Sequence, residues 1–143
     1  MAAPPPPSLY LLDTNILVSI SKLVPHVLQK LAEAGRQRVA MPTLVAAELA
    51  YGVEKSVHKE RNRQSLDFLL REFTVLPWTQ EAMWHYARHY HRLRQAGRLI
   101  GHMDLLIAAQ ALSLQAVLVT NNTREFERID GLRVEDWTAP AVP

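Results

Sequence analysis

The hydrophobic residues of this chain alternate between short continuous runs and helical repeats. Short apolar runs that end at a polar residue or a proline predict strands buried on both faces. We expect such strands at 9–12, 38–41, 74–76, 116–119 and 132–134. Apolar residues spaced three or four apart predict helices at 21–34, 43–55, 59–73, 79–96 and 102–114, with a short helical turn at 124–128. Strands that alternate with helices predict an α/β fold with a mostly parallel sheet.

Two of these helices have distinct patterns. The helix at 102–114 is apolar nearly all round, which is typical of a central, buried helix. The helix at 59–73 is charged on one side, and its expected apolar face consists of Leu66, Leu69, Leu70 and Phe73.

The length of the chain indicates how many domains it forms. A chain of 143 residues is expected to form one domain and to bury about two-thirds of its unfolded surface. We find no internal repeat and no linker. We expect a flexible proline-rich lead-in at 1–8, one domain at 9–137 and a short tail at 138–143.

Charge and cysteine content narrow the function. The chain has no cysteine, which excludes a disulfide framework and a thiolate metal site and fits a reducing compartment. The isoelectric point of about 9.2 indicates a mildly basic surface that is compatible with an anionic partner such as RNA. The sequence carries no signal-peptide pattern and no long apolar span, so we expect a cytoplasmic protein without contact to a membrane.

Asp13 is the first candidate for chemistry. It comes directly after the first predicted strand, and apolar residues follow it. A buried carboxylate without a partner is costly or takes up a proton. In an open parallel sheet, ligands bind at the carboxyl ends of the strands. Asp13 therefore predicts a bound cation or a hydrogen-bond donor.

Three further polar residues stand in comparable positions. Glu48 interrupts an apolar stretch, and it lies two residues beyond the position that a capping box would need. Asp104 opens the apolar helix, and Asn122 follows the fourth strand. Each has an ordinary alternative. Glu48 fits a solvated helix face, Asp104 fits the first turn of a helix, where the dipole favours an acid, and Asn122 fits a turn.

The combination of these residues favours a metal site. Asp13 and Asn122 follow parallel strands, and Asp104 opens the helix that leads into the second of them, so we expect all three at one end of the sheet. The Glu48 helix also follows a strand and can face the same cleft. Carboxylate and amide oxygens suit Mg²⁺ or Mn²⁺, which bind through a few carboxylates, waters and a substrate phosphate. Such a metal polarises a phosphodiester and activates a bound water.

An ordered set of motifs resembles the PIN-domain family, and in particular its VapC type. The motifs are Leu-Leu-Asp-Thr-Asn after a strand, Ala-Ala-Glu-Leu-Ala-Tyr-Gly, an aspartate before Leu-Leu-Ile-Ala-Ala, and Val-Thr-Asn-Asn-Thr-Arg-Glu-Phe. The resemblance extends from about residue 9 to residue 137. It implies a PIN-like three-layer fold with a short-stranded central sheet flanked by helices.

The resemblance also implies a function and a set of site residues. Members of the family cleave RNA endonucleolytically with Mg²⁺ or Mn²⁺, and the VapC type is the toxin of a toxin–antitoxin pair. By resemblance, Asp13, Glu48 and Asp104 bind the metal. Asn122 completes the catalytic set where many relatives carry a fourth acid, so a second metal ion is in question. The residues expected to orient the carboxylates are Thr14, Asn15 and Thr120.

The partners follow from the same resemblance. We expect a homodimer, an RNA substrate and a cognate antitoxin whose tail covers the active groove. The antitoxin's other end would bind DNA, so this chain would meet DNA only indirectly. A mildly basic surface is compatible with a structured RNA such as tRNA.

Other features favour packing over chemistry. His85 and His89 are four residues apart and His91 is close by, but no third ligand for a metal is evident, and an exposed helix face is the simpler interpretation. The same region carries candidate phosphate-binding arginines, namely Arg88, Arg92 and Arg98. Tyr51 and Trp78 could stack on bases, although single aromatic residues are more often core or dimer contacts.

Two alternatives to the nuclease are open. A phosphatase of the HAD type would need a second acid at position 15, which is Asn15, and a late lysine, but no lysine follows Lys59. A catalytically inactive PIN scaffold that only binds a partner would be marked by loss of two or more acids. All three core acids are present, which favours catalysis.

Overall fold

Five short strands form one parallel sheet in the computed structural model, which describes residues 7–140. The strand order is β3-β2-β1-β4-β5, and each neighbouring pair is parallel. The strands are β1 (Tyr10–Leu12), β2 (Val39–Pro42), β3 (Thr74–Leu76), β4 (Val117–Val119) and β5 (Arg133–Glu135). The predicted parallel α/β sheet is confirmed, and every predicted strand is present within two residues of its expected ends.

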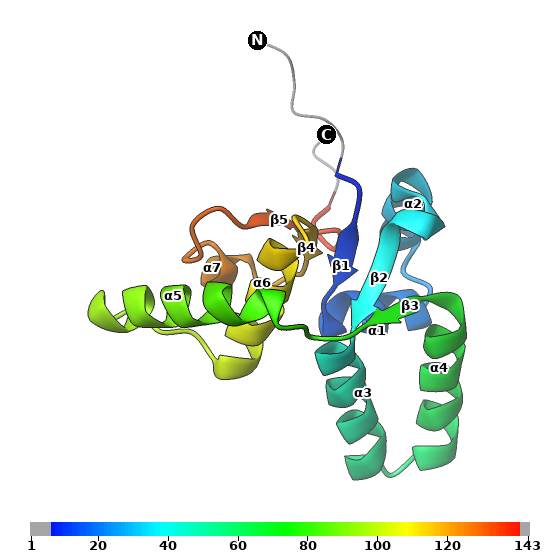
Figure 1. Cartoon of the computed structure of the whole chain (residues 1–143). Coiled ribbons are helices and arrows are strands. Elements are labelled where there is room, and N and C mark those ends of the chain that lie inside the picture. The colour runs from blue at the N-terminus through cyan, green and yellow to red at the C-terminus, as the bar shows by residue number, and fades with distance from the viewer. Residues whose placement is uncertain (1–6, 141–143) are drawn as a thin grey trace.

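Helices flank this sheet on both sides (Figure 1). α3 and α4 lie side by side next to the β2–β3 edge, and α5 lies along α6 near β4. The helices are α1 (Thr14–Ser21), α2 (Pro25–Ala34), α3 (Thr43–Lys55), α4 (Lys59–Glu72), α5 (Glu81–Gln95), α6 (His102–Ser113) and α7 (Thr123–Phe126), with a short 3₁₀ helix at Arg36–Arg38.

The predicted helix at 21–34 is wrong at its start. The chain forms α1 and α2 as separate helices, and Leu23 between them has a φ of 58°. The break has a local cause, because Pro25 disfavours a helical conformation for Val24, which is extended at φ −64° and ψ 117°. Pro25 instead occupies the first position of α2, where its fixed φ suits a helix.

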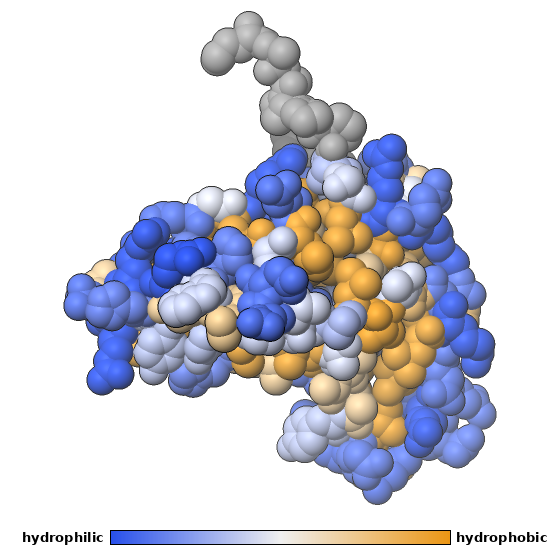
Figure 2. All heavy atoms as spheres, in the orientation of Figure 1, coloured by the Kyte–Doolittle hydropathy of each residue, from blue (hydrophilic) through white to orange (hydrophobic). Residues whose placement is uncertain are grey.

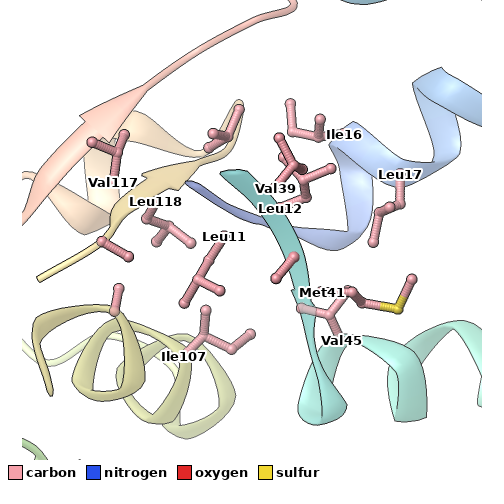
Figure 3. Close-up of a cluster of buried hydrophobic side chains, with 14 of the residues drawn as sticks. Leu11, Leu12, Ile16, Leu17, Val39, Met41, Val45, Ile107, Val117 and Leu118 are labelled. Atoms are coloured by element: carbon pink, nitrogen blue, oxygen red, sulfur yellow. The ribbon is translucent and has the colours of Figure 1, made fainter. Parts of the chain in front are cut away.

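The core lies on both faces of β1. Leu11 and Leu12 are completely buried, because β1 is the central strand and has a hydrogen-bonded neighbour on each side. Figure 3 shows that α1 supplies Ile16 and Leu17 and that α6 supplies Ile107 from another side of the strands. The prediction that α6 is a central, buried helix is confirmed.

The surface follows the amphipathic pattern with one exception. Figure 2 shows apolar residues gathered over the strands and continuing between α3 and α4, with hydrophilic residues over the outer surfaces of α4 and α5. Leu66 and Leu69 of α4 and Phe73 just after it are buried as predicted, but Leu70 is 40% exposed. The prediction for Leu70 is wrong because the predicted apolar face is wider than the face that α4 buries against its neighbours.

The chain changes direction at the centre of the sheet. It runs from β1 outward to β2 and β3, then crosses to the other side of β1 to form β4 and β5. In open parallel sheets this switch point leaves a crevice at the carboxyl ends of the two central strands, here β1 and β4. The sheet topology therefore marks where Asp13 and the residues after β4 meet.

Two further expectations concern the chain ends and membranes. Most of the lead-in at 1–8 and the last residues of the tail at 138–143 lie outside the described residues, so these boundaries stay predictions. Within residues 7–140, no helix has the length and apolar character that crossing a bilayer requires.

Candidate acidic site

Asp13 is held at the carboxyl end of β1 by three interactions. Its backbone N–H donates to the Val119 carbonyl at 2.9 Å, which extends the β1–β4 pairing by one residue. Its Oδ1 accepts from the Thr14 backbone N–H at 2.9 Å, as an N-cap of α1, and its Oδ2 accepts from the Thr120 hydroxyl at 2.8 Å. The side chain is only 5% exposed. These donors fix the carboxylate in one orientation.

Asn15 links this carboxylate to the segment after β4. Its side-chain nitrogen Nδ2 lies 3.4 Å from both Asp13 Oδ2 and the Thr120 hydroxyl, and its side-chain oxygen Oδ1 accepts from the Asn121 backbone N–H at 2.9 Å. The structure thus brings the expected orienting residues Asn15 and Thr120 to Asp13. Thr14 differs, because only its backbone contacts Asp13; its hydroxyl is buried with no hydrogen bond of ordinary length among residues 7–140.

Glu48 on α3 faces the same carboxylate. Partial burial raises the pKa of Glu48, and the negative charge of Asp13 raises it further. The nearby Thr14 hydroxyl opposes these two effects by favouring the charged form. Glu48 is therefore not on a solvated helix face remote from the site, which was the alternative interpretation.

Asp104 in the first turn of α6 shows the strongest effect. Burial raises the pKa of Asp104 to about 7, aided by a hydrogen bond with Glu125 and by the charges of Asp13, Glu125 and Glu48. Four carboxyl groups therefore influence one another in this crevice. With no cation present, their mutual repulsion favours a proton on Asp104.

Asn122 lies between two of these acids. Its amide nitrogen is 3.4 Å from Asp104 Oδ2 and 3.3 Å from Glu125 Oε2, so it can donate to both carboxylates. A neutral donor there reduces the repulsion between the two acids, whereas an aspartate would increase it. All four residues of the expected catalytic set thus lie in one site.

Glu125 is a member of the acidic site that the sequence analysis did not select. It lies on α7, three residues after Asn122, which caps that helix. Residues three apart share a helix face, so this spacing was an available signal. It is weak alone, because α7 has only four residues and its orientation depends on the completely buried Phe126.

The donor set fits a divalent metal in its chemistry. All five side chains offer oxygen, and burial together with the neighbouring negative charges raises the pKa of Asp104. Within residues 7–140, however, no three acidic or histidine side chains converge closely enough to ligate one ion directly. The arrangement therefore fits an ion such as Mg²⁺ that keeps several waters and uses one or two carboxylates.

A groove of about 950 Å³ opens onto this site. Thr14 and Glu48 line it together with apolar residues of α1, α3 and α4. Its basic lining residues come from the far ends of α1 and α3 and from the start of α4: Lys22, Lys55 and Arg61. The groove therefore combines an apolar wall with acidic and basic ends.

The candidate phosphate-binding arginines and the histidines of the same region lie elsewhere. Arg88, Arg92 and Arg98 are exposed on α5 and the following loop, and Arg92 pairs with Asp130 at 2.9 Å. Burial lowers the pKa of His89, followed by the charge of Arg92. The described residues contain no histidine-based metal cluster.

The candidate stacking residues have other contacts. The Trp78 indole donates to the Leu106 carbonyl at 2.9 Å, which ties the segment after β3 to α6. Tyr51 is 66% exposed on the wall of the groove, with the Lys55 ammonium 5.3 Å from its ring centre.

The fold and the site together define a class of protein, a parallel α/β domain with an acidic crevice at the switch point of its sheet. The family model described as "PIN domain" matches residues 10–132. Ribonuclease VapC2 from Rickettsia felis is 39% identical over 131 residues, which cover 90% of this chain and 98% of that protein. The tRNA(fMet)-specific endonuclease VapC from Shigella flexneri is 36% identical and covers 90% of this chain and 98% of its own length.

Solved structures agree with this assignment. The chain is similar to VapBC2 from Rickettsia felis bound to a promoter DNA fragment, with a TM-score of 0.84 and 37% identity over 90% of this chain and 98% of that one. It is also similar to VapBC-1 from nontypeable Haemophilus influenzae, with a TM-score of 0.82 and 34% identity over 92% and 99% of the two chains. The chain belongs to the PIN-domain family, and it is a VapC-type member of that family. This membership confirms the resemblance and sets aside the HAD-type phosphatase.

Proposed function

We propose that this protein is a metal-dependent endoribonuclease that hydrolyses RNA phosphodiesters and acts as the toxin of a toxin–antitoxin pair. The observation that carries the proposal is the cluster of acids around Asp104, where burial first, and then the hydrogen bond with Glu125 and the neighbouring negative charges, raise the pKa of Asp104 to about 7. A protein that maintains such a cluster at the switch point of its sheet is suited to bind a cation and an anionic substrate there.

The acids proposed to hold the metal are Asp13, Glu48 and Asp104, with Glu125 as a fourth; one or two of them would bind the ion directly and the others through its waters. Bound Mg²⁺ or Mn²⁺ would supply charge neutralisation at the scissile phosphate and would lower the pKa of a water near it. Glu125 provides the negative charge that the neutral amide of Asn122 does not.

The remaining residues of the site position these acids. The hydroxyl of Thr120 and the amide of Asn15 orient Asp13, and the amide nitrogen of Asn122 donates to Asp104 and Glu125. Such contacts commonly set the orientation and basicity of metal-binding side chains. The negative crevice would repel RNA without a cation, so substrate and metal are expected to bind together.

RNA as the substrate is supported by the relatives. Those reported above are named ribonuclease and tRNA(fMet)-specific endonuclease. The isoelectric point of about 9.2 is compatible with a polyanionic partner. We therefore include tRNA among the first substrates to test, with Arg88, Arg92 and Arg98 as candidate backbone contacts.

An antitoxin is the proposed protein partner. The similar structures include VapBC complexes, and the one from Rickettsia felis is bound to promoter DNA. The groove between α1, α3 and α4 is the proposed seat of the antitoxin's tail, because an occupant there would lie against Glu48 and block the acidic site. Contact with DNA through the antitoxin, a homodimer and a cytoplasmic location complete the proposal.

The decisive experiment is cleavage of total RNA and of purified tRNA with Mg²⁺, Mn²⁺ or EDTA. We expect cleavage only with metal, and a loss of at least about 100-fold in Asp13→Asn, Asp104→Asn and Glu125→Gln. Glu127→Gln is the matched control, because Glu127 is exposed just after α7.

Each result has a defined meaning. Equal activity in the Asp13→Asn or Asp104→Asn variant would contradict the assigned site and indicate a contaminating nuclease. A folded wild type that binds neither metal nor RNA would instead support the binding-only scaffold.

A further inference from the structure

Three aromatic side chains form a cluster where α5 packs on the start of α6, namely Tyr86 and Tyr90 of α5 and His102 of α6. The His102 ring stacks on Tyr90 with centroids 5.2 Å apart and planes at 23°. The Tyr86 hydroxyl lies 3.1 Å from His102 Nδ1, and the two tyrosine rings are 5.8 Å apart at 46°. This cluster is not used by the metal site.

The two tyrosines hold the histidine ring in place. Tyr86 and Tyr90 are four residues apart, so they lie on the same face of α5 and present both contacts together. Offset stacking and a hydrogen bond to one ring nitrogen restrict both torsions of His102. The ring is therefore set in one orientation before any ligand arrives.

The histidine stays exposed although the tyrosines hold it. Tyr86 and Tyr90 are partly buried, whereas His102 is exposed. Because Tyr90 covers one face of the ring, the opposite face and the Nε2 edge account for this exposure. Nε2 has no hydrogen-bond partner among the residues that the structure describes.

The histidine of the cluster lies two residues before Asp104, in the first turn of α6. A Cβ atom added at Gly101 would be 4.0 Å from Asp104 Oδ2, and His102 is the next residue in the chain. The Cα atoms of His102 and Asp104 are roughly 5–6 Å apart by helix geometry, and their side chains leave α6 on different sides. An RNA strand that contacts both side chains would therefore cross the N-terminal end of α6. Met103, by contrast, lines the groove, so the first turn of α6 separates the groove from the aromatic cluster.

We propose that His102 is a stacking platform for the base of a nucleotide next to the phosphodiester that is cleaved. An unpaired base would extend the Tyr90–His102 stack on its open face, and this favours cleavage in a single-stranded segment such as a loop. The inference rests on the proposed function and adds a position-specific contact to it. His102 positions the substrate and does not take part in the chemical step.

The test uses short single-stranded oligoribonucleotides that each carry 2-aminopurine at a different position, because stacking quenches its fluorescence. Binding is measured with Mg²⁺ in the full chain carrying Asp13→Asn, so that a cation offsets the negative charge of the crevice while cleavage does not interfere. We expect quenching at one position, and His102→Ala should remove it and weaken binding about tenfold, the value of one base–aromatic stack.

Two variants separate stacking from a structural role. His102→Phe keeps an aromatic face and should retain both quenching and affinity. His91→Ala is the matched control, because His91 is an exposed histidine on α5 outside the cluster. In cleavage assays with Mg²⁺, His102→Ala should raise KM about tenfold with little change in kcat.

The failure of this inference is distinguishable from that of the proposed function. A wild type that cleaves RNA, together with a folded His102→Ala variant of unchanged quenching and KM, would overturn the stacking role alone. If His102→Ala unfolds, loss of quenching in His102→Phe would overturn it. A wild type that neither binds nor cleaves RNA would overturn both proposals.

Discussion

The side chain of Asp104 carries the main electrostatic strain of the site. It is half-buried among Asp13, Glu48 and Glu125, and the amide of Asn122 only partly offsets their repulsion. Removing one charge from such a cluster relieves repulsion as long as no cation is bound. The residue expected to be essential for activity is therefore expected to cost stability.

Asp104→Asn should stabilise the metal-free protein at pH 8. We expect a gain of about 1 kcal/mol, or roughly 4 °C in Tm for a domain of this size. The measurement is thermal unfolding in EDTA. Asp67→Asn is the control, because Asp67 is an exposed partner of Arg63 at 3.6 Å and such pairs contribute only about 0.5 kcal/mol. A lower Tm for Asp104→Asn would show that its carboxylate is not strained.

On the scale of single elements, α4 shows that helical spacing does not by itself determine which apolar residues are buried. Leu69 and Leu70 are neighbours in the sequence and both belong to the predicted apolar face. Leu69 is 2% exposed and packs in the core, whereas Leu70 is 40% exposed. The elements packed against α4 determine the width of its buried stripe, and helical spacing alone does not predict this width.

Leu69→Ala should therefore be much more destabilising than Leu70→Ala. We expect a loss of about 2–5 kcal/mol in the free energy of unfolding for Leu69→Ala, from lost burial and the cavity left behind. Leu70→Ala should stay within about 0.5–1 kcal/mol of the wild type. Denaturant unfolding with both variants under the same conditions measures the difference, and equal losses would place Leu70 in a core or an interface.

The element α7 shows how a short helix acquires a role. A four-residue helix has no stability of its own, and α7 is held by Phe126, which is completely buried. This anchor turns Glu125 toward Asp104 and Asn122. The acidic site thus depends on a packing contact outside it.

On the scale of the whole molecule, the acidic site makes stability depend on pH. The pKa of Asp104 is about 7 in the folded protein, against an ordinary value of 3.8. Between these values the folded protein holds a proton that the unfolded chain has released. The free energy of unfolding therefore decreases as pH rises from about 4 to about 7.

We expect the Tm of the metal-free protein to be higher at pH 5 than at pH 8, and this difference to shrink in Asp104→Asn. The comparison is needed because His89, whose pKa is lowered by burial, contributes in the opposite direction. Mg²⁺ at a concentration of 100 Kd should add about 2.7 kcal/mol to the free energy of unfolding and therefore raise the Tm at pH 8. The increase should be much smaller in Asp104→Asn. A Tm at pH 8 that does not respond to Mg²⁺ in the wild type would contradict a metal site.

The local pattern of the sequence accounts for most elements and for half of the site. Strands and helices follow from the period of apolar residues, and this period depends only on neighbours in the chain. The same pattern places Asp13 after β1 and Asp104 in the first turn of α6, because a strand end and a helix start are local features. The motifs that resemble the PIN family add Glu48 and Asn122.

The tertiary structure alone decided how these residues act together. The crossing of the chain from β3 to β4 brings Thr120 to Asp13, and the burial of Phe126 orients Glu125. The stack of His102 on Tyr90 depends on the packing of α5 against α6. These contacts join residues far apart in the chain, and their geometry follows from how whole elements pack. A local period cannot encode it, which is why the sequence predicted that Asp13, Glu48 and Asp104 meet at one end of the sheet but did not include Glu125 among them.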